Sequence, residues 1–381
     1  MTGARCTDSA VSYEDLGPYS DWVDRVRRDE SRRPGWMDET PRRPEELRAL
    51  ACDILGPADG EERPHGVRVE ASWRDDEAGV SGELVTWDVG YGPRTEAYVL
   101  RPSSGDGPWP GVVALHCHGG FTYYGKEKVA DGPAGHDPVL DPVRRELYGG
   151  RAYANALARQ GVVVLVHDVF TWGSRRFVLA GSAHAGSAHA DEVARYNAAA
   201  SDHEHVVEKY CRLLGTTFAA VVAHEDRAAL AYLGSRPDVA TGRIGCVGLS
   251  GGGIRAAMLQ ATSDVAATVV VAMMSTYEGM LDRHVASHTW MLYPERWPTY
   301  GDWPDLAACR PSSPLLVQYQ RGDRLFSAEG MDDAHRMIAA VYASADNASG
   351  YEAQHYDGPH CFDIAMQETA FAWLRAALDR A

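Results

Sequence analysis

The sequence predicts an α/β fold in which a mostly parallel β-sheet is flanked by helices. From about residue 110 onward, short and continuously apolar runs alternate with longer helical stretches. A run without polar alternation is expected for a strand buried on both faces, and such strands alternating with helices imply a parallel sheet covered on both sides. The 381 residues, 45% of them hydrophobic, suffice for one large domain or two average ones with a sizeable core.

Residues 1–65 are charged and rich in proline, and we expect them to form an N-terminal helical extension that packs on the main domain, placed at 66–381. Helices are predicted near 19–30 and 44–54. Pro44 followed by two glutamates is typical of a helix start, because proline suits the first turn and acidic side chains favour the N-terminal end of the helix dipole. A partly disordered tail is the alternative for the first dozen residues.

The expected strands fall into two groups. The first three alternate apolar and polar residues, as half-exposed antiparallel strands do, and they would form an antiparallel edge of the sheet. Most later runs are continuously apolar and alternate with helices. The strand-like runs lie at 66–73, 79–88, 94–101, 112–116, 161–168, 244–249, 266–274, 314–320 and 351–357. Helices are expected near 150–160, 205–235, 252–262, 328–343 and 363–379.

Two segments do not fit this alternation, and both are expected to be lid or cap insertions. Residues 169–204 contain a tandem AGSAH repeat at 180–184 and 185–189, which is typical of a mobile loop or lid. Residues 275–310 are rich in large aromatic side chains, which usually line pockets; packing against the body of the domain is the alternative. These aromatic residues are Tyr277, Trp290, Tyr293, Trp297, Tyr300 and Trp303.

Charge and composition exclude several classes of partner. The net charge of −16 argues against nucleic-acid binding and against an anionic membrane surface, both of which favour basic patches. We find neither a secretory signal nor an apolar run of membrane-spanning length, so a cytoplasmic location is expected. The cysteines are scattered without a C-x-x-C pair, which predicts neither a disulfide framework nor a zinc knuckle. The partner expected is a small molecule, and formation of a homo-oligomer is left open.

The most informative motif is Gly248-Leu249-Ser250-Gly251-Gly252, which has the G-x-S-x-G form of a nucleophile elbow. In an elbow the serine lies on a tight turn between a strand and a helix. The crowding around it favours residues without a Cβ at the positions two before and two after, where Gly248 and Gly252 stand. The turn also places the serine at a helix N-terminus, where free N–H groups can bind a developing oxyanion.

A serine nucleophile needs a base, and the base needs an orienting acid. In this kind of fold the acid and then the base follow the serine along the chain, each just after a later strand. Asp323 follows the run at 314–320, and His360 follows the run at 351–357. The sequence therefore predicts a Ser250–Asp323–His360 catalytic triad.

Other residues could compete for these two roles. Glu278, Asp332 and Asp333 are the alternative acids; Glu278 follows the strand before Asp323, and the two aspartates are expected in a helix. His335 and His355 are the alternative bases, but one is expected in a helix and the other inside a strand. Structural or surface roles are the simpler interpretation for all five.

The oxyanion hole needs two backbone donors. Gly251, which follows the nucleophile, is expected to supply one. The other should come from the loop after the strand at 112–116, from the N–H of either His118 or Gly119. The glycines of this loop allow its backbone to turn the N–H groups toward a substrate.

Histidines also invite a metal interpretation, but no carboxylate or third ligand stands beside them at a recognisable metal spacing. The glycine-rich elbow lacks the lysine of a phosphate-binding P-loop. We therefore expect neither a metal nor a cofactor. The histidines considered are His116, His118, His184, His189, His203 and His205.

With these residues in place, the chain resembles the α/β-hydrolase superfamily, and more narrowly its branch of dienelactone hydrolases and acetylxylan-esterase-like enzymes. The resemblance implies an eight-stranded core and hydrolysis through a covalent acyl-enzyme, with Ser250 as nucleophile, Asp323 as acid and His360 as base. The matching segments, within about residues 80–380, are LHCHGGF at 115–121, GKEK at 125–128, DVFTWGSR at 168–175, GTTFAAVVAHEDRAALAYL at 215–233, RIGCVGLSGGG at 243–253, and the RGD and GPHCF segments.

The sequence departs from that branch in two ways. Dienelactone hydrolases proper use a cysteine nucleophile, whereas this chain has Ser250; Cys246 lies inside a predicted strand and Cys117 in the oxyanion loop, so neither replaces it. Many relatives have glycine where Cys117 stands. The function expected is a serine esterase that hydrolyses a carboxylic ester of a small or medium-sized molecule. An acyltransferase, or a lactone-forming or lactone-opening enzyme, would use the same triad; a peptidase or a non-catalytic binding protein is less expected.

Overall fold

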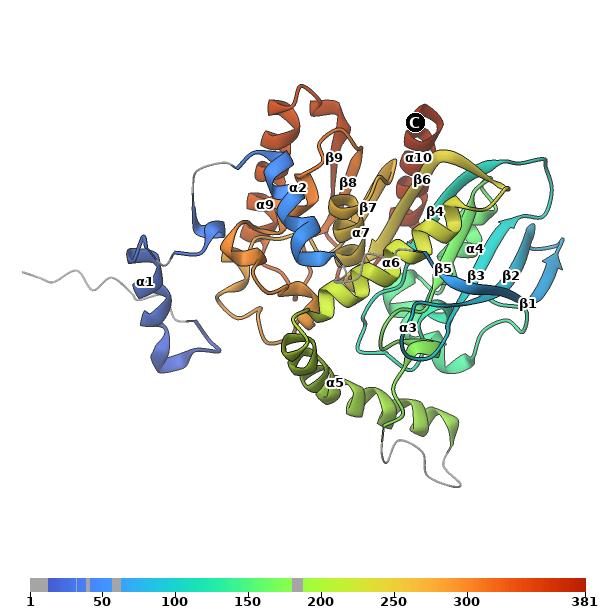
Figure 1. Ribbon diagram of the computed structural model, residues 1–381, viewed down its shortest axis with the longest axis horizontal. Helices are drawn as coiled ribbons and strands as arrows, with labels where there is room; N and C mark the ends of the chain where they lie inside the picture. Colours follow the sequence, from blue (N-terminus) through green and yellow to red (C-terminus); the bar gives the residue numbers. More distant parts are fainter. Residues whose placement is uncertain (1–12, 32, 39–41, 57–62, 180–187) are drawn as a thin grey trace, which may run out of the picture.

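The computed structural model describes residues 13–31, 33–38, 42–56, 63–179 and 188–381, shown in Figure 1. Their strands form one mixed sheet with the order β1-β2-β3-β5-β4-β6-β7-β8-β9. The strands are β1 (His65–Asp75), β2 (Val80–Asp88), β3 (Thr95–Pro102), β4 (Trp109–Leu115), β5 (Val163–His167), β6 (Val239–Leu249), β7 (Ala267–Val271), β8 (Leu315–Gln320) and β9 (Tyr351–Tyr356).

The sheet has an antiparallel part and a parallel part, as the sequence predicts. β1, β2, β3 and β5 pair with one another antiparallel in that order, whereas β5, β4, β6, β7, β8 and β9 pair parallel. The predicted fold class is thus confirmed, but the eight strands implied by the resemblance are wrong, because the sheet described has nine. β1 lies at the edge and is mostly exposed, and its charged side chains suit a strand with one unpaired side.

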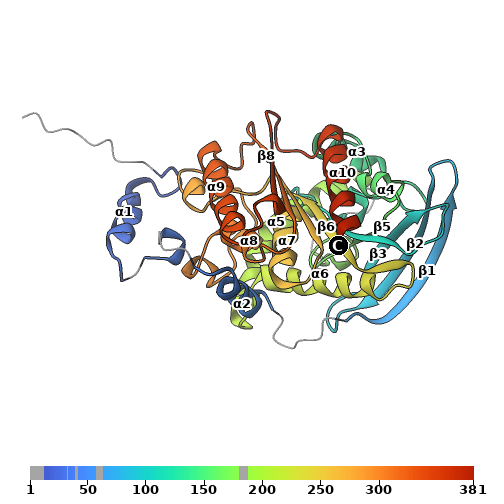
Figure 2. The same cartoon turned by 90° about the horizontal axis from the view of Figure 1, so that it is seen from above.

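Helices cover both faces of the sheet (Figure 2). Side chains of α2, α6, α7, α8 and α9 share one buried apolar cluster, and those of α4 and α10 share the cluster on the opposite face. The helices are α1 (Asp21–Arg28), α2 (Pro44–Leu55), α3 (Asp141–Tyr148), α4 (Tyr153–Ala158), α5 (His189–Leu213), α6 (Phe218–Gly234), α7 (Gly251–Thr262), α8 (Trp303–Ala308), α9 (Ala328–Ser344) and α10 (Ile364–Arg380).

The helix predicted at 205–235 is wrong in its extent, because two helices occupy this region. The chain turns at Gly215, whose φ of +75° suits glycine, and the Thr217 side chain accepts a hydrogen bond from the N–H of Ala220 at the start of α6. The preceding helix, α5, already begins at His189. Much of the predicted lid segment 169–204 is therefore helical, while the repeat within it lies largely at 180–187, outside the described residues.

The N-terminal region contributes α1 and α2, near the two positions expected. α2 packs on the first face of the sheet, where Leu47, Ala51 and Leu55 are buried. Arg48 on α2 donates hydrogen bonds to the carbonyls of Ala261 and Ser263 at the end of α7, the helix that follows the elbow. This region therefore braces the helix on which the site below depends.

Within the part of the chain that the structure describes, no helix is both long and apolar enough to cross a membrane.

Candidate active site

The predicted site residues gather at one edge of the sheet, because they follow strands that all run parallel. His118 follows β4, Ser250 follows β6, Asp323 follows β8 and His360 follows β9. Carboxyl ends of parallel strands meet at the same edge, where ligands of open α/β sheets bind. Strand order alone thus brings together residues that lie more than 200 positions apart in the sequence.

Ser250 lies on a strained turn between β6 and α7. Its φ of +57° and ψ of −121° are unusual for a residue with a side chain, and its N–H donates to the carbonyl of Val271 at 2.9 Å. A Cβ on Gly248 would collide with the backbone of Gly252, and one on Gly252 would collide with the carbonyl of Leu115. Close approach of the backbone therefore requires glycine at both positions, for the reason predicted above.

His360 and Asp323 form a short hydrogen-bonded pair. The Nδ1 atom of His360 lies 2.6 Å from Oδ2 of Asp323, whose side chain is fully buried. The other oxygen, Oδ1, accepts from the N–H of Leu325 at 2.8 Å and so fixes the carboxylate. Because Nδ1 is occupied, Nε2 is the nitrogen left for proton exchange in the cavity.

The backbone of His118 lies beside the elbow. A Cβ built on Gly251 would come 2.7 Å from the backbone nitrogen of His118, so these two residues are immediate neighbours. Gly119 and Gly120 both have φ of +61°, a turn that glycine adopts without strain. The sequence offers the N–H of His118 or that of Gly119 as the second oxyanion donor. The structure places the N–H of His118 next to Gly251.

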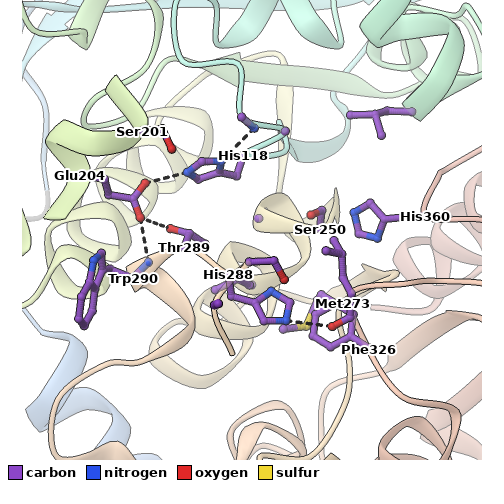
Figure 3. A pocket seen from close by; sticks show the side chains of 18 of the residues that line it. His118, Ser201, Glu204, Ser250, Met273, His288, Thr289, Trp290, Phe326 and His360 are labelled. Atoms are coloured by element: carbon purple, nitrogen blue, oxygen red, sulfur yellow. Dashed lines mark hydrogen bonds and ion pairs between the residues drawn. The ribbon is translucent and has the colours of Figure 1, made fainter. Parts of the chain in front are cut away.

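A cavity of about 320 Å³ opens over Ser250 (Figure 3). Both irregular segments of the sequence contribute to its walls: Ser201 and Glu204 belong to α5, and Trp290 belongs to the aromatic segment 275–310. Trp297 and Trp303 of the same segment are buried in the core instead. The lining residues are His118, Gly119, Gly120, Val143, Glu146, Leu147, Ser201, Glu204, His205, Ser250, Gly251, Ile254, Met273, residues 286–290, Leu325, Phe326 and His360.

A second carboxylate–imidazole pair faces this cavity. Glu204 Oε2 lies 2.7 Å from Nε2 of His118, while Oε1 accepts from the Thr289 hydroxyl at 2.7 Å and from the N–H of Trp290 at 2.8 Å (Figure 3). Nδ1 of His118 accepts from the N–H of Gly120 at 3.1 Å. Burial raises the pKa of Glu204, but the hydrogen bonds outweigh it and hold that pKa below its ordinary value.

Another imidazole in the cavity, that of His288, forms no ion pair with a carboxylate of the described residues. Its Nε2 donates to the carbonyl of Leu325 at 3.0 Å, and its ring stacks on Phe326 with centroids 4.7 Å apart. Burial lowers its pKa to about 4. His288 is therefore neutral at pH 7.

The alternative acids and bases are engaged elsewhere. Glu278 is exposed and pairs with Arg27, Asp332 pairs with Arg321, and Asp333 pairs with Arg336. His335 lies 3.0 Å from the Tyr351 hydroxyl, and His355 stacks on Tyr319. The structure places none of these five residues on the wall of the cavity over Ser250.

The histidines considered as metal ligands are dispersed. His189 pairs with Asp137, His203 packs edge-on against Phe177, and His205 accepts from the indole of Trp290. Burial, helped by the charges of Lys128 and Arg255, holds the pKa of His116 well below its ordinary value. His184 lies outside the described residues; elsewhere, no group of three potential ligands is close enough to hold a metal ion.

The cysteines near the elbow are buried. Cys246 points into the core beside Thr268, and burial raises the pKa of its thiol to about 12. Cys117, which precedes His118 in the loop after β4, is also fully buried.

Two residues of the site were missed by reasoning from the sequence. Glu204 lies in a segment expected to be a loop, and its helix places it against His118. Lys128 belongs to the GKEK run at 125–128, of which Lys126–Lys128 form a short 3-10 helix. This run, one of the segments that match the family, was the feature of the sequence that could have pointed to Lys128. Its ammonium lies directly behind the loop after β4.

The chain is similar to proteins described as hydrolases and esterases. The Bacillus subtilis (strain 168) protein described as "Putative hydrolase YtaP" is 27% identical over 305 residues, which cover 77% of this chain and 87% of that protein. A Bacteroides fragilis NCTC 9343 structure described as a "putative acetyl xylan esterase" aligns with a TM-score of 0.62, 16% identity, and coverage of 90% and 84%. Glucuronoyl esterase from Solibacter usitatus aligns with a TM-score of 0.55, 14% identity, and coverage of 92% and 96%.

No protein-family model matches this sequence. The architecture nevertheless agrees over nine-tenths of the chain with structures described as esterases, and the sequence is similar to that of a protein described as a hydrolase. The chain therefore has the α/β-hydrolase fold, and it resembles acetyl xylan esterases and glucuronoyl esterases in architecture.

Proposed function

We propose that this protein is a serine esterase that hydrolyses carboxylic esters of small or medium-sized molecules through an acyl-enzyme. The observation that carries the proposal is the arrangement around one cavity: a serine on a strained turn at a helix N-terminus, and a histidine oriented by a buried aspartate 2.6 Å away. Nucleophile, base and orienting acid in this relation are the requirements of acyl transfer.

In the first half of the reaction, Nε2 of His360 takes the proton from Ser250 Oγ as that oxygen attacks the ester carbonyl. The N–H groups of Gly251 and His118 hold the resulting oxyanion. Asp323 keeps His360 in the tautomer with a proton on Nδ1 and stabilises the imidazolium. Collapse of the tetrahedral intermediate breaks the ester C–O bond, and His360 gives its proton to the leaving alcohol.

In the second half, His360 takes a proton from water, and the hydroxide attacks the acylated Ser250. The second tetrahedral intermediate expels Ser250 Oγ, which recovers the proton from His360. The acid product leaves, and the protein returns to its starting state. The proposed cycle uses no cofactor.

An acetylated sugar is the first substrate to test. The cavity has a modest volume of about 320 Å³, and polar side chains such as Ser201, Glu146 and His205 stand among its apolar walls. A small cavity suits a short acyl group, and scattered polar groups suit a hydroxyl-rich alcohol. The names of the architecturally similar acetyl xylan and glucuronoyl esterases support a carbohydrate ester.

The test compares the wild type with Ser250→Ala on p-nitrophenyl esters of increasing acyl length and on acetylated xylose. We expect hydrolysis of the short esters by the wild type and a loss of about 10⁴-fold or more in kcat for the variant. A fluorophosphonate should label Ser250, identified by peptide mass spectrometry. Ser344→Ala, at the end of α9, is the matched control and should keep its activity.

Ser250→Ala with wild-type activity would overturn the proposal, as would a wild type that neither hydrolyses esters nor reacts with the fluorophosphonate. Adding a small alcohol to the assay separates hydrolysis from acyl transfer, because a transferase would form the new ester in preference to the acid. The cytoplasmic location stays a prediction from the sequence, which leaves the formation of a homo-oligomer open.

A further inference from the structure

Lys128 is a buried lysine whose ammonium is held by backbone carbonyls. Its side chain is fully buried, and Nζ donates to the carbonyls of Cys117 at 2.5 Å, His118 at 3.2 Å and Phe121 at 3.1 Å. All three carbonyls belong to the loop that follows β4. In the part of the chain that the structure describes, no carboxylate forms an ion pair with this ammonium, which distinguishes it from Lys126, paired with Glu96, Glu127 and Asp168.

The carbonyls that Lys128 binds belong to the same peptide groups as the candidate oxyanion donors. The carbonyl of Cys117 and the N–H of His118 are the two ends of one peptide group, and the carbonyl of His118 and the N–H of Gly119 are the ends of the next. A cation at the carbonyl end withdraws electron density from the peptide, which makes its N–H a stronger donor. The ammonium also holds the carbonyls on its own side of the loop.

We propose that Lys128 is a positioning residue for the oxyanion hole: its protonated ammonium fixes the loop after β4 and polarises the peptide groups that bind the oxyanion. This inference rests on the proposed function, because it assumes that an oxyanion forms beside Gly251 and His118. It predicts that catalysis requires Lys128 to carry its proton. The rate should therefore fall as the pH rises through the pKa of Lys128.

The surroundings of Lys128 bring that pKa into an accessible range. The pKa of Lys128 is lowered to about 8, chiefly by burial, and the positive charge of Arg255 on α7 acts in the same direction. The Cys117 thiol, the carboxylate of Asp168 after β5 and that of Glu127 beside it act in the opposite direction. The ring of Trp172 lies 5.8 Å from Nζ.

The kinetic test measures kcat and KM for p-nitrophenyl acetate between about pH 6 and pH 10. Lys128→Met removes the charge and the donors at nearly constant length, and Lys128→Gln keeps a neutral donor. We expect kcat of Lys128→Met to fall roughly 10- to 100-fold with KM little changed, less than the ~10²–10³-fold cost of deleting an oxyanion donor. The wild-type rate should decline near pH 8, and neither variant should show that decline.

A spectroscopic measurement ties the decline to Lys128 itself. The chain has only three lysines, Lys126, Lys128 and Lys209, so lysine labelled with ¹³C at Cε gives three resonances by NMR. Loss of one resonance in Lys128→Met assigns it, and its titration midpoint should match the kinetic decline. Lys209→Met, on the exposed side of α5, is the control and should keep both the activity and the alkaline decline.

The inference is overturned if Lys128→Gln keeps the wild-type kcat and the alkaline decline, or if Lys128 titrates near the ordinary lysine value while the decline stays near pH 8. Should Lys128→Met fail to fold, the kinetics of Lys128→Gln and the NMR titration of the wild type still test the inference. A wild type that hydrolyses esters and is labelled at Ser250, but whose Lys128 variants behave normally, refutes this inference alone. A wild type without esterase activity or labelling refutes the proposed function instead.

Discussion

Two carboxylate–imidazole pairs face one cavity, and they differ in which ring nitrogen the carboxylate holds. Asp323 binds Nδ1 of His360 at 2.6 Å, whereas Glu204 binds Nε2 of His118 at 2.7 Å. The distances are nearly equal, so hydrogen-bond length does not distinguish the pairs. The second nitrogen does: Nδ1 of His118 accepts from the N–H of Gly120, while Nε2 of His360 is left for exchange with the cavity.

The two pairs therefore suit different tasks. A base must have a nitrogen that can accept a proton, and the accepted charge must be stabilised by the acid behind it. His118 has both nitrogens engaged, and its ring ties the loop after β4 to α5 and, through Glu204, to Thr289 and Trp290. A histidine–acid pair in a cavity is not by itself a catalytic base; the nitrogen left over decides the role.

Replacing each histidine with glutamine gives the largest expected difference. His360→Gln should lower kcat by about 10⁴-fold, because no group remains to accept the proton of Ser250. His118→Gln should lower kcat by less than about tenfold, because the proposed donor is its backbone N–H, which the substitution keeps. The measurement is the steady-state rate on p-nitrophenyl acetate.

His355→Gln serves as the control, because its ring stacks on Tyr319 away from the cavity. Equal losses in His118→Gln and His360→Gln would show that the occupied nitrogen does not separate the two roles.

Replacing each acid with its amide should lower mainly kcat in one pair and mainly the stability of the protein in the other. Asp323→Asn should lower kcat by about 10³- to 10⁴-fold, because the amide favours the wrong tautomer of His360. Glu204→Gln should leave kcat within about tenfold, but it should lower the free energy of unfolding by about 1–3 kcal/mol, because three partly buried hydrogen bonds to a carboxylate are weakened. Urea unfolding and steady-state kinetics on both variants give the two quantities.

The opposite assignment, with Glu204→Gln the more harmful to kcat at unchanged stability, would place the catalytic acid on α5.

The sequence could predict the Asp323–His360 pair because the order of the strands brings its two residues together. Ser250, Asp323 and His360 each follow a strand-like run, and the carboxyl ends of parallel strands meet at one edge. The elbow glycines carry their own signal, since only residues without a Cβ tolerate the contacts at Gly248 and Gly252. Most of the sheet was predictable for a similar reason: each of the nine strand-like runs lies in or overlaps a strand.

The second pair could not be predicted, because its partners meet through a helix whose position depends on tertiary packing. A single helix was predicted over 205–235, so the break between α5 and α6 around Gly215 was missed. Because residues 169–204 are expected to form a loop or lid, the sequence does not predict the direction of the Glu204 side chain. The contacts of Lys128 could not be predicted for another reason: its partners are backbone carbonyls, which leave no pattern in the amino-acid sequence.

His288 provides the smallest effect and sharpens the comparison, because it is an imidazole in the same cavity that relies on a carbonyl instead of a carboxylate. Burial lowers its pKa to about 4, so the folded protein does not protonate it between about pH 6.5 and pH 4, whereas the unfolded chain does. The unfolded state then binds more protons, and stability must fall as the pH drops through this window.

His288→Gln keeps a donor for the Leu325 carbonyl but removes the titration. We expect the free energy of unfolding of the wild type to fall more than that of the variant between pH 7 and pH 5, with a difference on the order of 1 kcal/mol after allowance for solvent screening. Urea unfolding of both proteins at the two pH values measures it. Identical losses would mean that His288 is protonated in the folded state as readily as in the unfolded chain, and that burial beside Leu325 and Phe326 does not keep its ring neutral.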